Sequence, residues 1–207
     1  MALGPVLKQG LARLYWSCPI NPNPADIGLS LRQAIFVTVI HQSQQIMTTQ
    51  LEIPEKALQI KETKPFTALC FTTRTSLSTL SQYVFTVAED LYREANRLGL
   101  EVSGPIQWIY TGVNGDETNE FSLDIVLPIS QPGSQSDRFR YQIFPSFRCA
   151  CYTFTGPWSE FGMLYDLLFS QLYRDGYQND GYVREVYTVI DLENPALCVT
   201  EIQIKVL

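Results

Sequence analysis

Glu185 is the residue of this sequence best suited to bind a charged ligand. It lies in VREVYTV, a β-branched run that predicts a strand. Alternation along a strand places Val183, Glu185 and Tyr187 on one face. A carboxylate among aromatic rings and away from water attracts a cation more strongly than one in solvent. The alternative is a surface ion pair of Glu185 with Arg184 or Arg148, which would stabilise the fold little.

Trp108 and Tyr110 share one face of a second predicted strand. The segment QWIYT aligns with REVYT, so Trp108 and Glu185 are equivalent positions of an internal repeat. Aromatic rings that face an acid suit a flat cation, because cation–π attraction contributes about 0.5–2 kcal/mol per ring. Burial in the core is the alternative explanation for both residues.

Three further aromatic residues are candidates for the same site. Phe161 and Tyr165 lie one turn apart on a predicted helix, although packing of that helix on a sheet explains them equally well. Trp158 follows a Thr-Gly-Pro turn and is a candidate for a contact at the rim, with a purely structural role in the turn as the alternative.

The composition excludes several kinds of chemistry. One histidine, His41, leaves little material for a metal site or a serine–histidine–aspartate triad, so we expect neither a metal nor a cofactor. The cysteines form no CxxC pair and mostly lie in apolar runs: Cys18, Cys70, Cys149, Cys151 and Cys198. Buried, reduced thiols of this kind predict a cytoplasmic protein.

The formal net charge of −6 bears on possible partners. No cluster of lysine and arginine is present, so direct binding to nucleic acid is not expected. A membrane partner is not expected either, because the longest apolar run near the start, Ala34 to Ile40, is far shorter than a bilayer span.

Residues 1–46 show no sustained periodicity and are interrupted by prolines, whereas a compact domain is predicted to begin near Met47. We therefore expect a flexible N-terminal extension, or a start codon assigned too far upstream. The alternative is a short helix at Leu29 to Gln42 packed on the domain.

Two copies of one order of elements fill residues 57–207, as repeat one (about 57–130) and repeat two (about 137–207). Each copy reads as strand, strand, helix, strand, strand, and we predict an α+β fold in which the copies share a core. The elements of repeat one are two strands in Ala57–Thr75 separated by Lys64-Pro65, a helix at Leu80–Leu98, and strands at Pro105–Thr111 and Glu120–Ile129. Those of repeat two are strands at Arg138–Phe144 and Phe147–Thr155, a helix at Trp158–Tyr173, and strands at Val183–Ile190 and Val199–Val206.

Four segments in this order resemble the GyrI-like family, which includes the effector-binding domains of AraC-type and MerR-type regulators and free-standing gyrase-inhibitor-like proteins. They are GPIQWIY from Gly104, TGPWSEF from Thr155, REVY from Arg184 and TEIQIKV from Thr200. The resemblance implies a tandem of strand-helix-strand-strand (SHS2-type) units with a groove between them that binds small, often cationic and aromatic, molecules.

The resemblance also implies site residues and a function. The family's pocket glutamate matches Glu185, so ligand contacts are expected from Glu185, Tyr187, Trp108, Tyr110, Phe161, Tyr165 and Trp158. The expected function is to sense or sequester a small hydrophobic cation, without catalysis. A protein partner, if present, would be a regulator or gyrase, and the chain itself could form a homodimer.

Two other functions remain open. Some family members are hydrolases that open strained cyclopropane rings, and in such an enzyme Glu185 would be the general base. An acidic domain could also inhibit gyrase by mimicking nucleic acid, although the acidic residues here are scattered. Residues 1–46 are too short and too rich in proline for a DNA-reading domain, which puts regulation by this chain alone in doubt.

Overall fold

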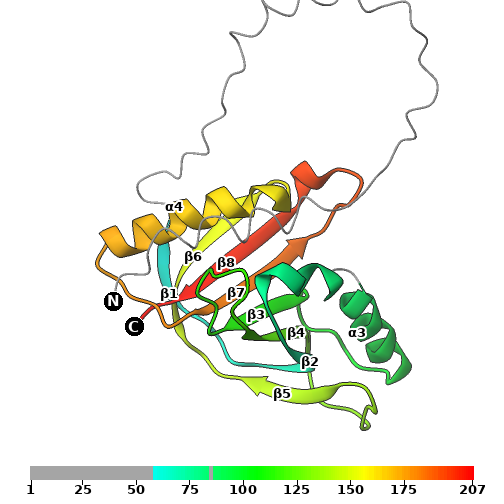
Figure 1. Cartoon of the computed structure of the whole chain (residues 1–207). Helices are drawn as coiled ribbons and strands as arrows, with labels where there is room; N and C mark the ends of the chain where they lie inside the picture. Colours follow the sequence, from blue (N-terminus) through cyan, green and yellow to red (C-terminus); the bar gives the residue numbers. More distant parts are fainter. Residues whose placement is uncertain (1–57, 84–85) are drawn as a thin grey trace, which may run out of the picture. The chain divides into compact units, whose positions relative to one another are not determined.

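The computed structural model describes residues 58–83 and 86–207 (Figure 1). The predicted N-terminal extension and its alternative helix at Leu29 to Gln42 lie outside the described residues.

The first repeat has the predicted order of elements. They are β1 (Gln59–Glu62), β2 (Phe66–Thr75), the 3₁₀ helix η1 (Leu77–Tyr83), α3 (Thr86–Arg97), β3 (Gln107–Thr111) and β4 (Phe121–Ile129). The helix predicted from Leu80 requires a correction, because the chain is 3₁₀-helical to Tyr83 and the α-helix starts at Thr86. The cause is local. The Thr79 hydroxyl bonds to the backbone N–H and C=O of Ser76, and such side-chain bonds compete with a regular helical turn.

The second repeat follows the same order. It contains β5 (Arg140–Phe144), β6 (Arg148–Thr155), η2 (Trp158–Glu160), α4 (Phe161–Arg174), β7 (Tyr182–Val189), η3 (Pro195–Leu197) and β8 (Val199–Lys205). Gly176 ends α4 as predicted. Its φ of 82° is in the left-handed region, and its N–H donates to the Tyr173 carbonyl at 3.1 Å.

One antiparallel sheet of eight strands joins the repeats, in the order β1-β6-β8-β7-β3-β4-β2-β5. The join is the pairing of β3 with β7, where Trp108 lies directly opposite Glu185. A two-fold axis through that pair maps β3 onto β7 in the same alignment as the sequence repeat, QWIYT onto REVYT. Trp108 and Glu185 are therefore equivalent in space as well as in sequence.

The first strand of each repeat pairs with the other repeat. β1 pairs with β6, and β5 pairs with β2. Where the two connections meet, the Thr63 N–H donates to the Phe147 carbonyl at 2.9 Å, and the Phe147 N–H donates to the Thr63 hydroxyl at 3.0 Å. The repeats are therefore interlocked at the edges of the sheet as well as joined at its centre.

Helix α4 packs on the sheet through the face predicted from its spacing. Its buried residues include Phe161, Leu164, Tyr165, Leu168 and Leu172, and burial of each such apolar side chain contributes about 1.5–3 kcal/mol. Helix α3 contacts β2 and β4 (Figure 1). No helix in the described part of the chain is both long and apolar enough to cross a bilayer.

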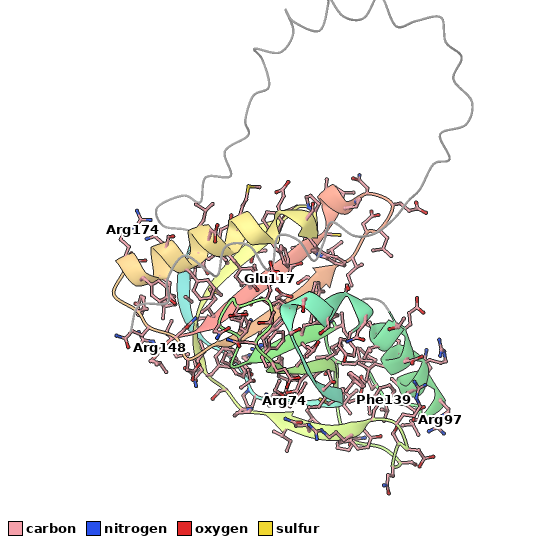
Figure 2. All side chains as sticks on the ribbon, in the orientation of Figure 1. Arg74, Arg97, Glu117, Phe139, Arg148 and Arg174 are labelled. Carbon is pink, nitrogen blue, oxygen red and sulfur yellow. The ribbon has the colours of Figure 1, made fainter. Side chains whose placement is uncertain are left out.

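Successive residues of β7 point to opposite faces of the sheet, which we name the Glu185 face and the Arg184 face. The row of paired residues on the Glu185 face is Tyr152, Ile202, Glu185, Trp108, Ile125 and Phe71. The parallel row on the Arg184 face is Cys151, Gln203, Arg184, Ile109, Asp124 and Thr72. Figure 2 shows that the labelled arginines are spread out, with Arg97 at the α3 end and Arg174 at the α4 end.

Candidate functional site

Glu185 is fully buried at the centre of the sheet. Its carboxylate accepts three hydrogen bonds from tyrosine hydroxyls. Tyr110 and Tyr187 donate to Oε2 at 2.8 and 2.5 Å, and Tyr165 donates to Oε1 at 2.6 Å. The sequence-predicted acid and three of the predicted aromatic residues therefore form one cluster.

Each donor comes from a different element. Tyr110 lies on β3, Tyr187 lies two residues beyond Glu185 on β7, and Tyr165 projects from the buried face of α4. The strand alternation that places Tyr187 on the face of Glu185 also places Tyr110 there, because Trp108 and Glu185 are cross-strand partners. Both repeats and one helix are required to assemble the cluster.

Burial raises the pKa of the Glu185 carboxyl above its usual range, and the three tyrosine hydrogen bonds lower it by a smaller amount. Within residues 58–83 and 86–207, no basic side chain forms an ion pair with Glu185. Among the described residues, only neutral donors thus compensate the charge of this buried acid, which is costly for the ionised form.

A surface ion pair does not describe Glu185. Arg184 lies on the opposite face of the sheet, where its Nε donates to Gln203 Oε1 at 2.6 Å. The Arg148 guanidinium lies over the ring of Tyr177, 5.8 Å from its centre. The alternative that paired Glu185 with either arginine is wrong because strand alternation separates Glu185 from Arg184 and burial separates it from solvent.

Two tryptophans pack around Tyr187. Trp108 is 6% exposed and meets the Tyr187 ring edge-on at 6.3 Å. Trp158 meets the same ring at 5.3 Å, and its indole N–H donates to the Thr200 hydroxyl at 3.2 Å. The tryptophans hold the tyrosine ring beside the carboxylate.

Phe161 lies one layer away from the carboxylate. Its side chain is fully buried and makes edge contacts with Phe154 at 5.8 Å and with Tyr165 at 6.1 Å. Packing of α4 on β6 accounts for this position, so Phe161 supports Tyr165 within the core.

Thr200 belongs to the cluster but was not anticipated. It is 1% exposed and lies opposite Tyr187 across the β7–β8 pair. The signal was present in the segment VTEIQIK, because alternation places a polar threonine on the same buried face as Ile202 and Ile204.

The geometry limits the chemistry. A carboxylate that accepts only neutral hydrogen bonds can hold a proton or meet a cation, and aromatic rings on several sides offer cation–π contacts. The described cysteines do not belong to this site: Cys149 and Cys151 are buried free thiols on the Arg184 face, in the core as predicted.

Solved structures with the same architecture include the C-terminal domain of EcmrR, with a TM-score of 0.63 and 18% identity over 72% of this chain and 96% of that one. The match to EcmrR in a DNA complex spans only 56% of that longer chain. SAV2435 bound to tetraphenylphosphonium matches at a TM-score of 0.51 and 13% identity, covering 72% of this chain and 93% of that one. A hydrolase encoded by lin2189 from Listeria innocua matches at a TM-score of 0.51 and 14% identity, covering 74% and 93%.

At these identities the structural matches establish a shared fold. No curated protein matches the sequence significantly. The model of the GyrI-like small molecule binding domain, in contrast, matches residues 56–207 continuously, from just before β1 to the last residue. The chain therefore belongs to the GyrI-like small-molecule-binding domain family.

Proposed function

We propose that this domain binds a hydrophobic cation at Glu185, to sense it or to sequester it. The observation that carries the proposal is the fully buried carboxylate held by three tyrosine hydroxyls, without a basic partner among the described residues. A ligand cation would supply the missing positive charge in a site where water does not weaken the attraction.

Binding requires side chains to move. Because the Glu185 carboxylate is completely covered, a ligand that touches it must displace at least one covering side chain. The tyrosine hydroxyls then act as replaceable partners, which satisfy the carboxylate in the free protein and give way to a stronger, charged partner. The aromatic rings of the cluster can pack against the body of the ligand.

Two isosteric ions test the proposal. Tetraphenylphosphonium and tetraphenylborate have the same shape and opposite charges, and we expect calorimetry to detect binding of the cation only. Glu185→Gln keeps the side-chain size and should weaken the cation by about 2–5 kcal/mol. Glu89→Gln removes an exposed carboxyl on α3 and is the matched control. Binding of both ions with equal affinity, or equal binding by wild type and Glu185→Gln, would reject the charge role.

Hydrolysis is the second candidate, and the raised pKa of Glu185 favours it, because a general base is most effective near the working pH. A hydrolase should convert a strained cyclopropane electrophile to a product that has gained one water. Glu185→Gln should then lower turnover by about 10²–10⁴ with little change in affinity. Mass spectrometry of the incubated electrophile separates the two functions, since a binding protein leaves it unchanged.

We also propose a cellular compartment, a partner and an assembly for this protein. The four cysteines that the structure describes are buried free thiols, which suit a reducing compartment such as the cytoplasm. Co-purification can test whether a regulator or gyrase is a partner. Size-exclusion chromatography can test whether the chain forms a homodimer.

A further inference from the structure

The Arg184 face of the sheet contains a cavity of about 290 Å³, on the side opposite Glu185. Its floor is formed by the central strands β3 and β4, and one wall by the connection from β5 to β6. The lining residues that matter here are Thr111, Asp124, Phe144, Phe147, Tyr182 and Lys205. The volume is at the lower end of small-molecule sites, enough for a ligand with one ring.

The walls are aromatic and fixed in place. Phe144 stacks on Phe66 with ring centres 5.1 Å apart, and Phe147 meets Tyr182 edge-on at 4.9 Å. Behind them the buried Arg184 guanidinium lies over both phenylalanine rings, 5.3 Å from the centre of Phe66 and 4.7 Å from that of Phe147. Such packing preorganises the walls and lowers the ordering cost of binding.

Asp124 supplies an acidic group in the lining. Its Oδ1 accepts the Thr72 hydroxyl and the Cys70 thiol and lies 3.8 Å from Arg140 Nη2. Its Oδ2 makes no hydrogen bond with any residue that the structure describes, and the side chain is 13% exposed. One carboxylate oxygen, which can only accept hydrogen bonds when ionised, is thus left for a donor from outside.

The basic residue in the lining, Lys205, already has an acidic partner. Lys205 Nζ is 2.5 Å from Asp180 Oδ2, so its ammonium has a carboxylate partner. Arg184 Nη1 has no hydrogen-bond partner in the described part of the chain, but it is buried, and Arg184 is not among the residues that line the cavity. Among the charged residues of the lining, Asp124 is therefore the one that keeps an oxygen without a hydrogen bond to a described residue, while its other oxygen faces Arg140.

From this arrangement we propose that the cavity is a second ligand site, specific for a small monocation that has one aromatic ring and a short alkylammonium arm. The ammonium donates to Asp124 Oδ2 while the ring packs against Phe147 and Tyr182. The site is separated from Glu185 by the thickness of the sheet and does not depend on the function proposed for that residue.

Tyramine is the probe, and its neutral analogue tyrosol, in which a hydroxyl replaces the ammonium, is the chemical control. Isothermal titration of the full chain should show tyramine binding at least about tenfold more tightly than tyrosol, as expected for a charge-assisted hydrogen bond. Asp124→Asn should remove that preference by weakening tyramine at least about tenfold. Glu89→Gln should leave tyramine binding unchanged, and Asp124→Asn should bind tetraphenylphosphonium as wild type does, which separates this proposal from the one above.

A second variant keeps the test decisive if Asp124→Asn does not fold. Thr111 lies at the exposed end of β3 and lines the cavity without contacting Asp124 in any described hydrogen bond. Thr111→Phe fills the cavity and should abolish tyramine binding while preserving the strand, since aromatic residues suit strands. The proposal is overturned if wild type does not bind tyramine, if Thr111→Phe binds it as wild type does, or if Glu185→Gln alone loses it.

Discussion

Tyr110 and Tyr187 occupy equivalent positions on the two central strands and donate to the same oxygen of Glu185. The two-fold relationship of the repeats thus delivers two identical donors to one acceptor, although only the second repeat carries the acid. The equivalent position of the first repeat holds Trp108. The two repeats therefore differ at the two-fold axis, where one has an aromatic ring and the other has the acid.

The shared acceptor predicts coupling between the two tyrosines. Tyr110→Phe or Tyr187→Phe alone leaves one donor on Oε2, whereas the double substitution leaves this buried oxygen unsatisfied. We expect the double variant to lose at least about 0.5 kcal/mol more unfolding free energy than the sum of the single variants. Urea denaturation measures all three, and Tyr173→Phe, on the more exposed side of α4, is the control for removing a phenol. Additive losses would show that the two hydrogen bonds act independently.

The pH dependence of stability should report on Glu185. Because burial raises its pKa, the folded protein holds the proton at pH values where the unfolded chain has lost it. The stability that Glu185 contributes is therefore full below the unfolded pKa of about 4.3 and is lost as pH rises through the folded pKa.

Glu185→Gln does not titrate, so its unfolding free energy should fall less than that of wild type between about pH 4 and pH 8. Chemical denaturation at a series of pH values gives both curves, and Glu89→Gln should follow wild type. Parallel curves for wild type and Glu185→Gln would mean that Glu185 has the same pKa in both states.

Two glycines with the same backbone conformation should respond differently to alanine. Gly176 and Gly181 have φ values of 82° and 81°. A Cβ at Gly176 would meet nothing within 4 Å, whereas one at Gly181 would lie 2.7 Å from the backbone oxygen of Val113. We expect Gly176→Ala to cost about 1–2 kcal/mol from strain alone, and Gly181→Ala to cost about 1–3 kcal/mol more. Equal melting temperatures for the two variants would contradict this close approach of the β7 and β3 ends.

Arg184 tests whether a buried guanidinium is retained for its packing or for its charge. Arg184→Met fills most of the space between Phe66 and Phe147, while Arg184→Ala leaves a cavity there. If packing dominates, the alanine variant should lose about 2–5 kcal/mol and the methionine variant clearly less, because removal of a buried charge that forms no ion pair with a described residue offsets part of the loss. Equal losses would show that the hydrogen bond to Gln203 is the main contribution of Arg184.

Local patterns in the sequence were sufficient to predict the elements and their faces. Spacings of three and four residues identified the buried face of α4, and the repeat of QWIYT as REVYT located the two strands that meet at the centre. Both signals are properties of short segments, so they can be read from the sequence without knowing which element packs against each segment. The start of α3 was misplaced for a reason of the same kind, because serine and threonine hydroxyls favour a 3₁₀ turn that apolar spacing does not reveal.

Pairing across long distances could not be predicted. Nothing in the short segments of β1 (QIKE) and β5 (RYQIF) specifies that the partner strand lies in the other repeat. The same limit applies to Tyr165, since a tyrosine on a buried helical face is explained by packing until Glu185 is placed beneath it. Asp124 was overlooked because one acid in an apolar strand has no distinctive spacing.

The exchange of edge strands has a consequence for how the chain acquires its structure during synthesis. When repeat one leaves the ribosome, β1 has no strand to pair with and the outer edge of β2 is open, because both partners are encoded downstream. The nascent first repeat cannot complete its strand pairing, because β1 and the outer edge of β2 pair only after β6 and β5 have been synthesised. An open β edge during that interval is a site for wrong pairing, so release of the complete chain, and chaperones that shield it until then, should govern the yield of native protein.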